Sequence, residues 1–261
     1  MIEINMNGKV AIVTGSASGL GKAIALRFAQ AGADVAVADI NIENALKTAE
    51  EIKSLGRKSI AFQIDTRDSE SFSKLIDATT ENLGGLDFMI NNAGIGIMKP
   101  ILEFSSNEID LVIDIDLKGT IYGCKAALAY MMPRKTGRIV NLSSIAAKMA
   151  TPASSVYAAA KAGVMALTAA LAREAADSNI NINAICPGVV RTEMWEKQLN
   201  AMAEDNSEEA KAKIFASFTD MIPLKRPQEP DDIANMAIFL CSDLANNITA
   251  QSFAVDGGAT T

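Results

Sequence analysis

Short apolar runs alternate with longer stretches of helical periodicity over most of the chain. The first run, residues 9–14, is mostly apolar and ends beside a glycine, which is typical of a strand buried on both faces. The longer stretches repeat apolar residues at helical spacing and end near glycine or proline. The predicted strands are residues 9–14, 34–39, 59–64, 86–90, 138–142, 180–185 and 252–255. The predicted helices are residues 20–32, 43–55, 69–82, 108–132, 155–176 and 231–240.

This alternation predicts an α/β fold with one doubly wound parallel sheet and helices on both of its faces. No linker, repeat or low-complexity segment divides the chain, so we expect a single domain over residues 1–261. Only residues 191–230 break the rhythm, because they are polar and helix-prone and stand between a strand and the last helix. We predict that this insertion forms a helical lid over the substrate, and we call it the lid segment.

The amino-acid composition excludes several kinds of catalytic site and of partner. The chain has no histidine, which excludes Ser-His-Asp and Cys-His catalysis and HExxH zinc sites. The 24 basic residues face 31 acidic ones, a net charge of −7, and no Lys/Arg run stands out. We therefore expect neither a nucleic-acid partner nor an anionic membrane surface.

Cysteine usage and the apolar runs suggest a location. The three cysteines, at positions 124, 186 and 241, are far apart, so neither a disulfide framework nor a metal site is expected. The N-terminal residues lack the apolar stretch of a signal peptide, and no apolar run approaches about 18 residues. We expect a cytoplasmic protein.

A glycine-rich loop joins the first predicted strand to the first helix. Gly15 permits a tight turn, Gly19 lets the backbone approach a pyrophosphate, and Gly21 allows close packing of helix and strand. The helix N-terminus around Ser18 and Leu20 supplies free N–H donors and the positive end of the helix dipole. A strand, loop and helix in this order predict a dinucleotide site.

The second predicted strand ends in an acidic residue, and this residue indicates which dinucleotide the site binds. Asp39 lies 18 residues after Gly21, with Ile40 beside it. An acid at this place bonds the ribose hydroxyls of NAD and repels the 2′-phosphate of NADP. No Lys or Arg lies in the loop or next to Asp39, so NAD is the predicted cofactor.

Tyr157 and Lys161 stand four residues apart and therefore on one face of a predicted helix. A reaction that moves a proton on or off an oxygen atom needs an acid/base group, and the chain has no histidine for this task. A free tyrosine has a pKa near 10, and an adjacent ammonium lowers it by favouring the phenolate. Taken alone, a tyrosine in an alanine-rich helix is better explained by core packing, but together with Ser144 and the glycine loop a catalytic role is favoured.

Together these motifs resemble the short-chain dehydrogenase/reductase family over essentially the whole chain. The resemblance implies a Rossmann-like fold and hydride transfer with a nicotinamide cofactor. The matching segments are residues 14–21 (TGSASGLG), 91–94 (NNAG), Ser144, Tyr157 with Lys161 (YxxxK), Pro187 with Gly188 and Thr192, and 256–258 (DGG).

The resemblance also implies roles for single residues. Tyr157 is the acid/base, Ser144 donates a hydrogen bond to the substrate oxygen, and Lys161 holds the nicotinamide ribose. The implied cofactor contacts further include Asp65 and Thr66 at the adenine, Asn92, Ala93 and Gly94 in the floor, and Pro187, Gly188, Val190 and Thr192 at the nicotinamide. For Asp65, a cap of the strand end is an equally good explanation. Family members are commonly homotetramers, which we expect here as well.

One position departs from the family. Where the family has an asparagine that helps to keep a water in a proton relay, this chain has Asp116. An ionised carboxylate accepts hydrogen bonds but donates none, and it favours the charged form of Lys161. We expect a working relay with altered pH dependence; a weakened or inactive enzyme is the alternative.

The lid segment bears on the substrate. Its tryptophan, Trp195, follows Thr192 by three residues and is predicted to form a wall of the substrate pocket. The segment resembles that of acetoin/2,3-butanediol and polyol dehydrogenases. We therefore expect an NAD(H)-dependent oxidoreductase of small secondary alcohols, diols or polyols and the matching ketones. A 3-oxoacyl-acyl-carrier-protein reductase, a hydroxysteroid dehydrogenase and a non-catalytic NAD-binding regulator remain alternatives.

Overall fold

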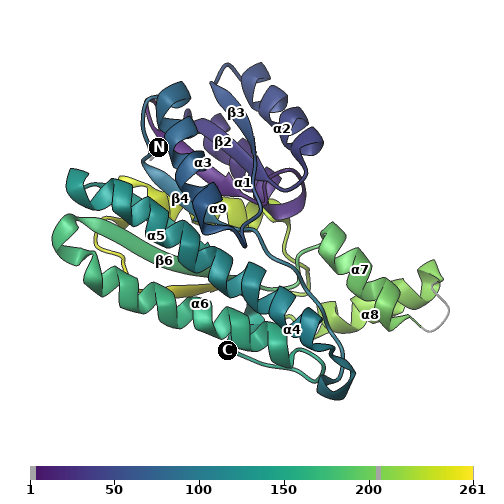
Figure 1. The fold of residues 1–261 in the computed structure, drawn as a ribbon. Helices are drawn as coiled ribbons and strands as arrows, with labels where there is room; N and C mark the ends of the chain where they lie inside the picture. The colour runs from purple at the N-terminus through teal and green to yellow at the C-terminus, as the bar shows by residue number, and fades with distance from the viewer. Residues whose placement is uncertain (1–3, 204–206, 261) are drawn as a thin grey trace.

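The computed structural model describes residues 4–203 and 207–260, and these form a parallel sheet covered by helices on both faces (Figure 1). The strands are β1 (Val10–Thr14), β2 (Asp34–Asp39), β3 (Ser59–Gln63), β4 (Phe88–Asn91), β5 (Gly137–Leu142), β6 (Ile180–Pro187) and β7 (Ser252–Val255). The helices are α1 (Gly19–Gln30), α2 (Ile42–Ser54), α3 (Ser69–Leu83), α4 (Ser106–Val112), α5 (Gly119–Met131), α6 (Ser155–Glu174), α7 (Glu193–Met202), α8 (Glu208–Asp220) and α9 (Pro230–Cys241).

The sheet has the order β3-β2-β1-β4-β5-β6-β7, and all its neighbouring strands are parallel. The chain first builds outward from β1 to β3 and then crosses back to place β4 on the other side of β1. Ligands bind where such a reversal opens a crevice at the carboxyl ends of the strands. This edge is where the glycine loop after β1 and the NNAG segment after β4 meet.

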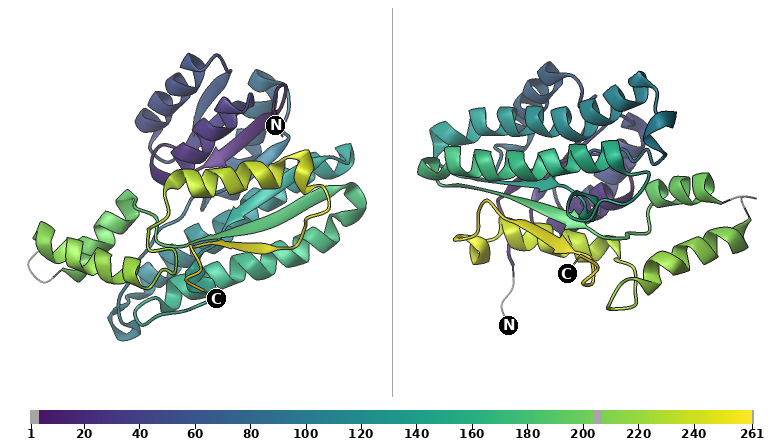
Figure 2. Two further views of the ribbon diagram at one scale, coloured as in Figure 1. Left: turned by 180° about the vertical axis from the view of Figure 1, so that it is seen from behind. Right: turned by 90° about the horizontal axis from the view of Figure 1, so that it is seen from below.

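Two apolar cores lie on the two faces of the sheet. Alternate residues of β1 point to opposite sides: Ala11 and Val13 pack with α1, α2 and α9, whereas Val10 and Ile12 pack with α3, α5 and α6. Both faces are covered, which is why the strands are continuously apolar. Figure 2 shows the sheet between these helices, with α7 and α8 projecting from one end of the molecule.

The predicted α/β architecture is confirmed, and each predicted strand is present within two residues of its predicted ends. One predicted helix, residues 108–132, is wrong as a single α-helix. It divides into α4, a π-helix over Ile113–Lys118, and α5. The π-helix hydrogen-bond pattern accommodates a widened turn without breaking the apolar pattern, so periodicity does not reveal it.

Among the described residues one helix, α6, is long and apolar enough to cross a membrane by length and composition. This is weak evidence, because a helix that packs on a protein core passes the same test. Here α6 packs along β6 and the π-helix, which places one of its faces inside the molecule (Figure 1).

Candidate active site

The loop after β1 has the shape that its glycines predict. Gly15 and Gly19 adopt φ angles of +63° and +53°, in the left-handed region that favours glycine. Gly21 is helical, but a Cβ there would collide with the carbonyl oxygen of Gly15 and the amide of Asn92. The loop therefore turns tightly and α1 packs directly against it.

The N-terminus of α1 is available for an anion. Ser18 is its N-cap residue, yet its side chain caps no backbone N–H. A Cβ added to Gly19 would meet only the Thr192 side chain, at 3.9 Å, so the backbone here faces open space bounded by the start of α7. Free N–H donors, the helix dipole and this space fit the pyrophosphate of a dinucleotide.

Asp39 is tied to the same loop. Its carboxylate accepts hydrogen bonds from the backbone N–H of Ala17 and of Asn41, both at 2.9 Å. These bonds hold the charge at the carboxyl end of β2, beside the glycine loop. Ile40, next in the chain, is 63% exposed. The carboxylate lies where the sequence predicts a ribose-binding acid, and that role stays a prediction.

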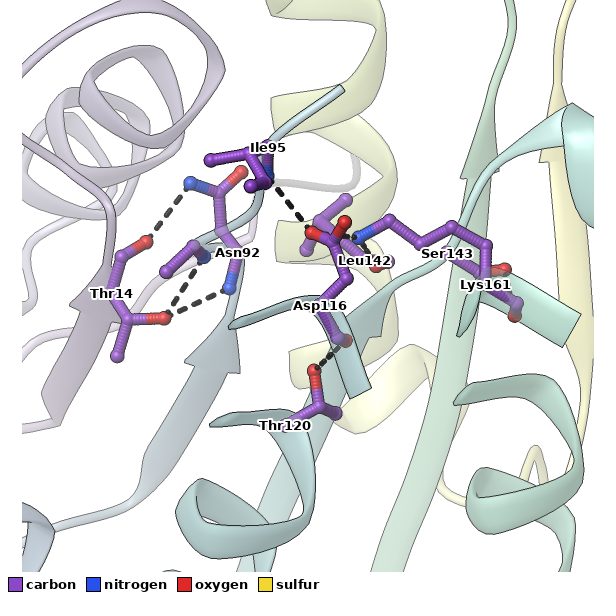
Figure 3. Close-up of polar contacts among 9 residues, drawn as sticks. Thr14, Asn92, Ile95, Asp116, Thr120, Leu142, Ser143 and Lys161 are labelled. Atoms are coloured by element: carbon purple, nitrogen blue, oxygen red, sulfur yellow. Dashed lines mark hydrogen bonds and ion pairs between the residues drawn. The ribbon is translucent and has the colours of Figure 1, made fainter. Parts of the chain in front are cut away.

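Thr14 and Asn92 join the two halves of the crevice. The Thr14 hydroxyl accepts hydrogen bonds from the N–H of Asn92 at 3.0 Å and of Ala93 at 3.1 Å (Figure 3). The Asn92 amide donates to the carbonyls of Thr14 and Gly15 at 2.9 and 3.0 Å. Asn92 thus fixes the floor against the glycine loop. Thr14 is therefore a positioning residue, a role that its sequence motif does not indicate.

A buried ion pair forms the centre of the site. Lys161 Nζ lies 3.4 Å from Asp116 Oδ1 and donates to the Leu142 carbonyl at 3.1 Å (Figure 3). The same Asp116 oxygen accepts from the N–H of Ile95 at 2.9 Å. A Cβ on Gly94 would press on the Asp116 carboxylate and on Lys161, so the NNAG segment must end in glycine to admit this pair.

Burial governs the titration of the pair. Asp116 is fully buried, and its Oδ2 has no hydrogen-bond partner within the described residues. Burial raises the pKa of Asp116, against the opposing effect of the Lys161 charge and the Ile95 N–H. Burial on its own lowers the pKa of Lys161, but Asp116 and Tyr157 together raise it above its ordinary value. Lys161 is therefore a firmly held cation at neutral pH.

Tyr157 stands on the same face of α6, with its ring centroid 5.7 Å from Lys161 Nζ. Burial raises the pKa of Tyr157, whereas Lys161 and a hydrogen bond from Ser144 lower it, and Asp116 raises it further. Lys161 thus acts in the predicted direction, but burial outweighs it and the phenol is protonated at neutral pH. Ser143 ties this arrangement to β5, because its hydroxyl donates to the Lys161 carbonyl at 2.8 Å.

Asp65 and Thr66 follow β3, where an adenine contact is predicted. The Asp65 carboxylate pairs with the Arg67 guanidinium at 2.6 Å, and this hydrogen bond lowers the pKa of Asp65. Thr66 is buried against Gly119 at the start of α5. Their contact with a cofactor stays a prediction, and the Arg67 pairing was not foreseen.

Pro187, Gly188 and Val190 leave β6 toward the lid segment. The N–H of Gly188 donates to Val255 at 3.0 Å, while that of Gln228 donates to Val189 at 2.9 Å. Gln228 is 3% exposed, and a Cβ on Gly188 would collide with its Oε1. Gln228 therefore supports the predicted nicotinamide segment from behind, a role that no sequence pattern indicated.

The lid segment forms α7 and α8, with residues 204–206 between them outside the described residues. Trp195 packs edge-on against Phe218, at 5.0 Å between ring centroids, and against Phe215, at 6.1 Å. Met194 and Gln198 of α7 lie beside Gly96 in the loop after β4. Trp195 as a pocket wall stays a prediction.

A cavity of about 380 Å³ lies between α7 and α8, apart from the reacting centre. It is lined by residues such as Arg191, Leu199, Lys211, Phe215 and Pro227. Ser144, Tyr157, Lys161 and Asp116 are not among its lining residues. The chemistry must be assigned from the polar cluster at the carboxyl ends of the strands instead of from this cavity.

Comparison with known proteins identifies the family of this chain. The family model described as enoyl-(acyl carrier protein) reductase matches residues 15–260. The chain is 38% identical over 251 residues to a diacetyl reductase [(S)-acetoin forming] of Staphylococcus epidermidis, covering 96% of this chain and 98% of the relative. It is 36% identical to an L-2,3-butanediol dehydrogenase of Corynebacterium glutamicum, covering 96% and 98%.

A solved structure of NAD⁺-bound xylitol dehydrogenase superimposes with a TM-score of 0.92 at 29% identity, covering 97% of this chain and 99% of that one. The similarity therefore extends over the whole fold, the glycine loop and the Tyr157–Lys161 helix included. The chain belongs to the short-chain dehydrogenase/reductase family of oxidoreductases.

Proposed function

We propose that this protein is an NAD(H)-dependent dehydrogenase that interconverts a small secondary alcohol, a diol or polyol, and the corresponding ketone. The single observation that carries the proposal is the cluster of Ser144, Tyr157 and Lys161 beside an open helix N-terminus. The relatives named for diacetyl, butanediol and xylitol support the substrate class. On family resemblance we also propose a cytoplasmic homotetramer.

The residues at the crevice fit a nicotinamide dinucleotide, which would supply the hydride donor or acceptor. The loop of Gly15 to Gly21 would hold the pyrophosphate and Asp39 the adenosine ribose. Lys161 would bond the second ribose, and the segment after β6 would hold the nicotinamide. These assignments rest on free donors, on space and on charge at the described residues.

The proton is handled by the chain's own groups. In carbonyl reduction, Tyr157 gives its proton to the substrate oxygen while Ser144 donates a hydrogen bond to that oxygen. In alcohol oxidation, the Tyr157 phenolate takes the hydroxyl proton. The Lys161 ammonium stabilises the phenolate electrostatically, and Asp116 fixes the position of Lys161.

The test is an absorbance assay at 340 nm with each cofactor against a substrate panel. The panel holds 2,3-butanediol, acetoin, diacetyl, xylitol, a 3-oxoacyl thioester and a hydroxysteroid. Turnover of a diol, hydroxyketone or polyol with NAD(H) supports the proposal. Preferred reduction of the thioester with NADPH would replace it with the acyl-carrier-protein reductase, and binding of NAD without any turnover would favour the regulatory alternative.

Asp39 allows a matched test of cofactor choice. Asp39→Asn removes the charge but keeps a side-chain oxygen that can accept from the Ala17 N–H. We expect the NAD-over-NADP ratio of kcat/KM to fall roughly tenfold or more, because a 2′-phosphate is no longer repelled. Asp34→Asn serves as the control, because Asp34 lies at the opposite end of β2 and its carboxylate is already paired with Arg57. An unchanged ratio in Asp39→Asn would remove the charge argument.

A further inference from the structure

Four described side chains of α7 form two rows that face different parts of the molecule. Trp195 contacts the aromatic rings of α8, and Leu199, one turn later, is 3% exposed. Met194 and Gln198 form the adjacent row, since they too are four residues apart. A Cβ added to Gly96 would lie 2.6 Å from Gln198 Nε2 and 3.2 Å from Met194 Sδ. The second row therefore lies against the loop after β4.

That loop leads directly to the reacting centre. Ile95 donates its N–H to Asp116 at 2.9 Å, and a Cβ on Gly94 would lie 3.2 Å from Lys161 Nζ. Gly94 and Gly96 are two residues apart, and two residues of extended chain span at most about 7 Å. The residue beside Lys161 and the residue beside Gln198 therefore belong to the same short stretch of the loop after β4. Glycine at position 96 is what lets the Gln198 amide come this close.

Gln198 is unusual in its surroundings. It is 8% exposed, and polar side chains that are this deeply buried normally make hydrogen bonds. A primary amide both donates and accepts hydrogen bonds. It can therefore bind a hydroxyl or a carbonyl oxygen, the two forms that the neighbouring oxygen takes in a diol, a hydroxyketone or a diketone.

We propose that Gln198 binds the second oxygen of a substrate with oxygens on adjacent carbons, while Met194 packs against its carbon chain. The assignment rests on the proposed dehydrogenase function and specifies its substrate. Tyr157 and Ser144 take the oxygen that reacts, and Gln198 takes the one that does not. Selectivity for vicinal oxygens then comes from α7, through an interaction that a simple alcohol does not make.

The test compares matched substrates. Gln198→Leu keeps most of the side-chain volume but cannot hydrogen-bond, so the second oxygen is left unsatisfied. We expect kcat/KM to fall roughly 10- to 100-fold for 2,3-butanediol and diacetyl but to stay within about threefold for 2-butanol and 2-butanone. Leu199→Met, which changes a buried apolar side chain in the row of α7 that faces α8, should leave the ratio between the two substrate pairs unchanged.

A second variant tests the direction of the hydrogen bond. Gln198→Glu retains an acceptor but has no N–H, so it can accept from a diol and cannot donate to a diketone. We expect diacetyl reduction to fall well below 2,3-butanediol oxidation in this variant. Circular dichroism and NAD binding verify that each variant folds and binds the cofactor.

The outcomes separate the inference from the proposed function. Two results would show that Gln198 does not bind the second oxygen, while leaving the dehydrogenase function intact. In the first, wild type oxidises 2-butanol as efficiently as 2,3-butanediol. In the second, Gln198→Leu lowers kcat/KM for both alcohols to the same extent. If wild type oxidises no secondary alcohol with either cofactor, the proposed function itself fails.

Discussion

Three aspartates of this site have the same carboxylate group but different surroundings. Asp39 accepts two backbone N–H groups at the crevice edge, and Asp65 is held by a guanidinium that lowers its pKa. Asp116 is fully buried beside Lys161, and burial raises its pKa. Environment, not residue type, sets what each carboxylate can do. The Asp116 environment has a direct consequence for pH dependence.

Asp116 raises the pKa of Tyr157, so Asp116→Asn should lower it. Oxidation needs the phenolate, whose fraction grows tenfold per pH unit below the pKa. In wild type we therefore expect kcat/KM for oxidation to rise with pH, while kcat/KM for reduction is flat near neutrality and falls at alkaline pH. In Asp116→Asn both transitions should move to lower pH. Profiles of rate against pH in both directions provide the measurement.

Asp114→Asn is the control for this experiment. Asp114 belongs to the same π-helix and pairs with Lys118 at 2.8 Å, away from the reacting centre. Its profile should match wild type. Profiles of Asp116→Asn that superimpose on wild type would show that the acid has no special influence, and loss of all activity with normal NAD binding would indicate that the pair is needed for catalysis itself.

At the level of elements, two irregular segments place the reacting groups. The π-helix of residues 113–118 turns Asp116 inward, and Thr120 at the start of α5 donates to the Asp116 carbonyl at 3.0 Å (Figure 3). The glycine loop brings α1 against β1 and β4. Single-turn π-helices are frequent at functional sites because they redirect one side chain without ending the helix.

Gly21→Ala tests the close packing of α1. The added methyl group would collide with Gly15 and Asn92, although a helical position itself accepts alanine. We expect a loss of about 1–3 kcal/mol in the free energy of unfolding, together with weaker NAD binding. Gly85→Ala is the matched control, because its Cβ would lie 3.8 Å from the Tyr130 hydroxyl, an ordinary contact. Denaturant unfolding and NAD titration measure both; equal stability of the two variants would contradict the packing argument.

At the scale of the whole molecule, the reversal of strand order between β1 and β4 brings residues far apart in sequence to one edge. Thr14 meets Asn92, and Gly94 meets both Asp116 and Lys161. On the outside, α6 exposes alanines along one face, at positions 159, 162, 166 and 170. Small side chains allow another helix to approach closely, as an assembly through this face would require.

The proposed tetramer predicts the effect of a charge on that face. Ala166→Glu should lower the mass in solution below that of a tetramer, because it places a charge within a close helix contact. Ala216→Glu introduces the same charge on the exposed side of α8 and should leave the mass unchanged. Sedimentation equilibrium measures both variants. A tetramer that persists in Ala166→Glu, or a wild type that is monomeric, would exclude α6 as the interface.

The sequence alone determined the order of strands and helices, the glycine loop and the pairing of Tyr157 with Lys161. These features depend on local periodicity and on short spacings, which a chain carries in its residue order. The boundaries of nearly all predicted elements are accordingly confirmed within two residues.

Other features of the site depend on tertiary structure and cannot be inferred from the spacing of residues along the chain. The π-helix places Asp116 beside Lys161. The orientation of α7 places Gln198 beside Gly96 and Trp195 against the rings of α8, and Gln228 is buried beside Gly188. Each of these placements depends on how an element is turned and on which distant segment packs against it. Such contacts form between residues remote in sequence, so their geometry is fixed only when the sheet brings the segments together.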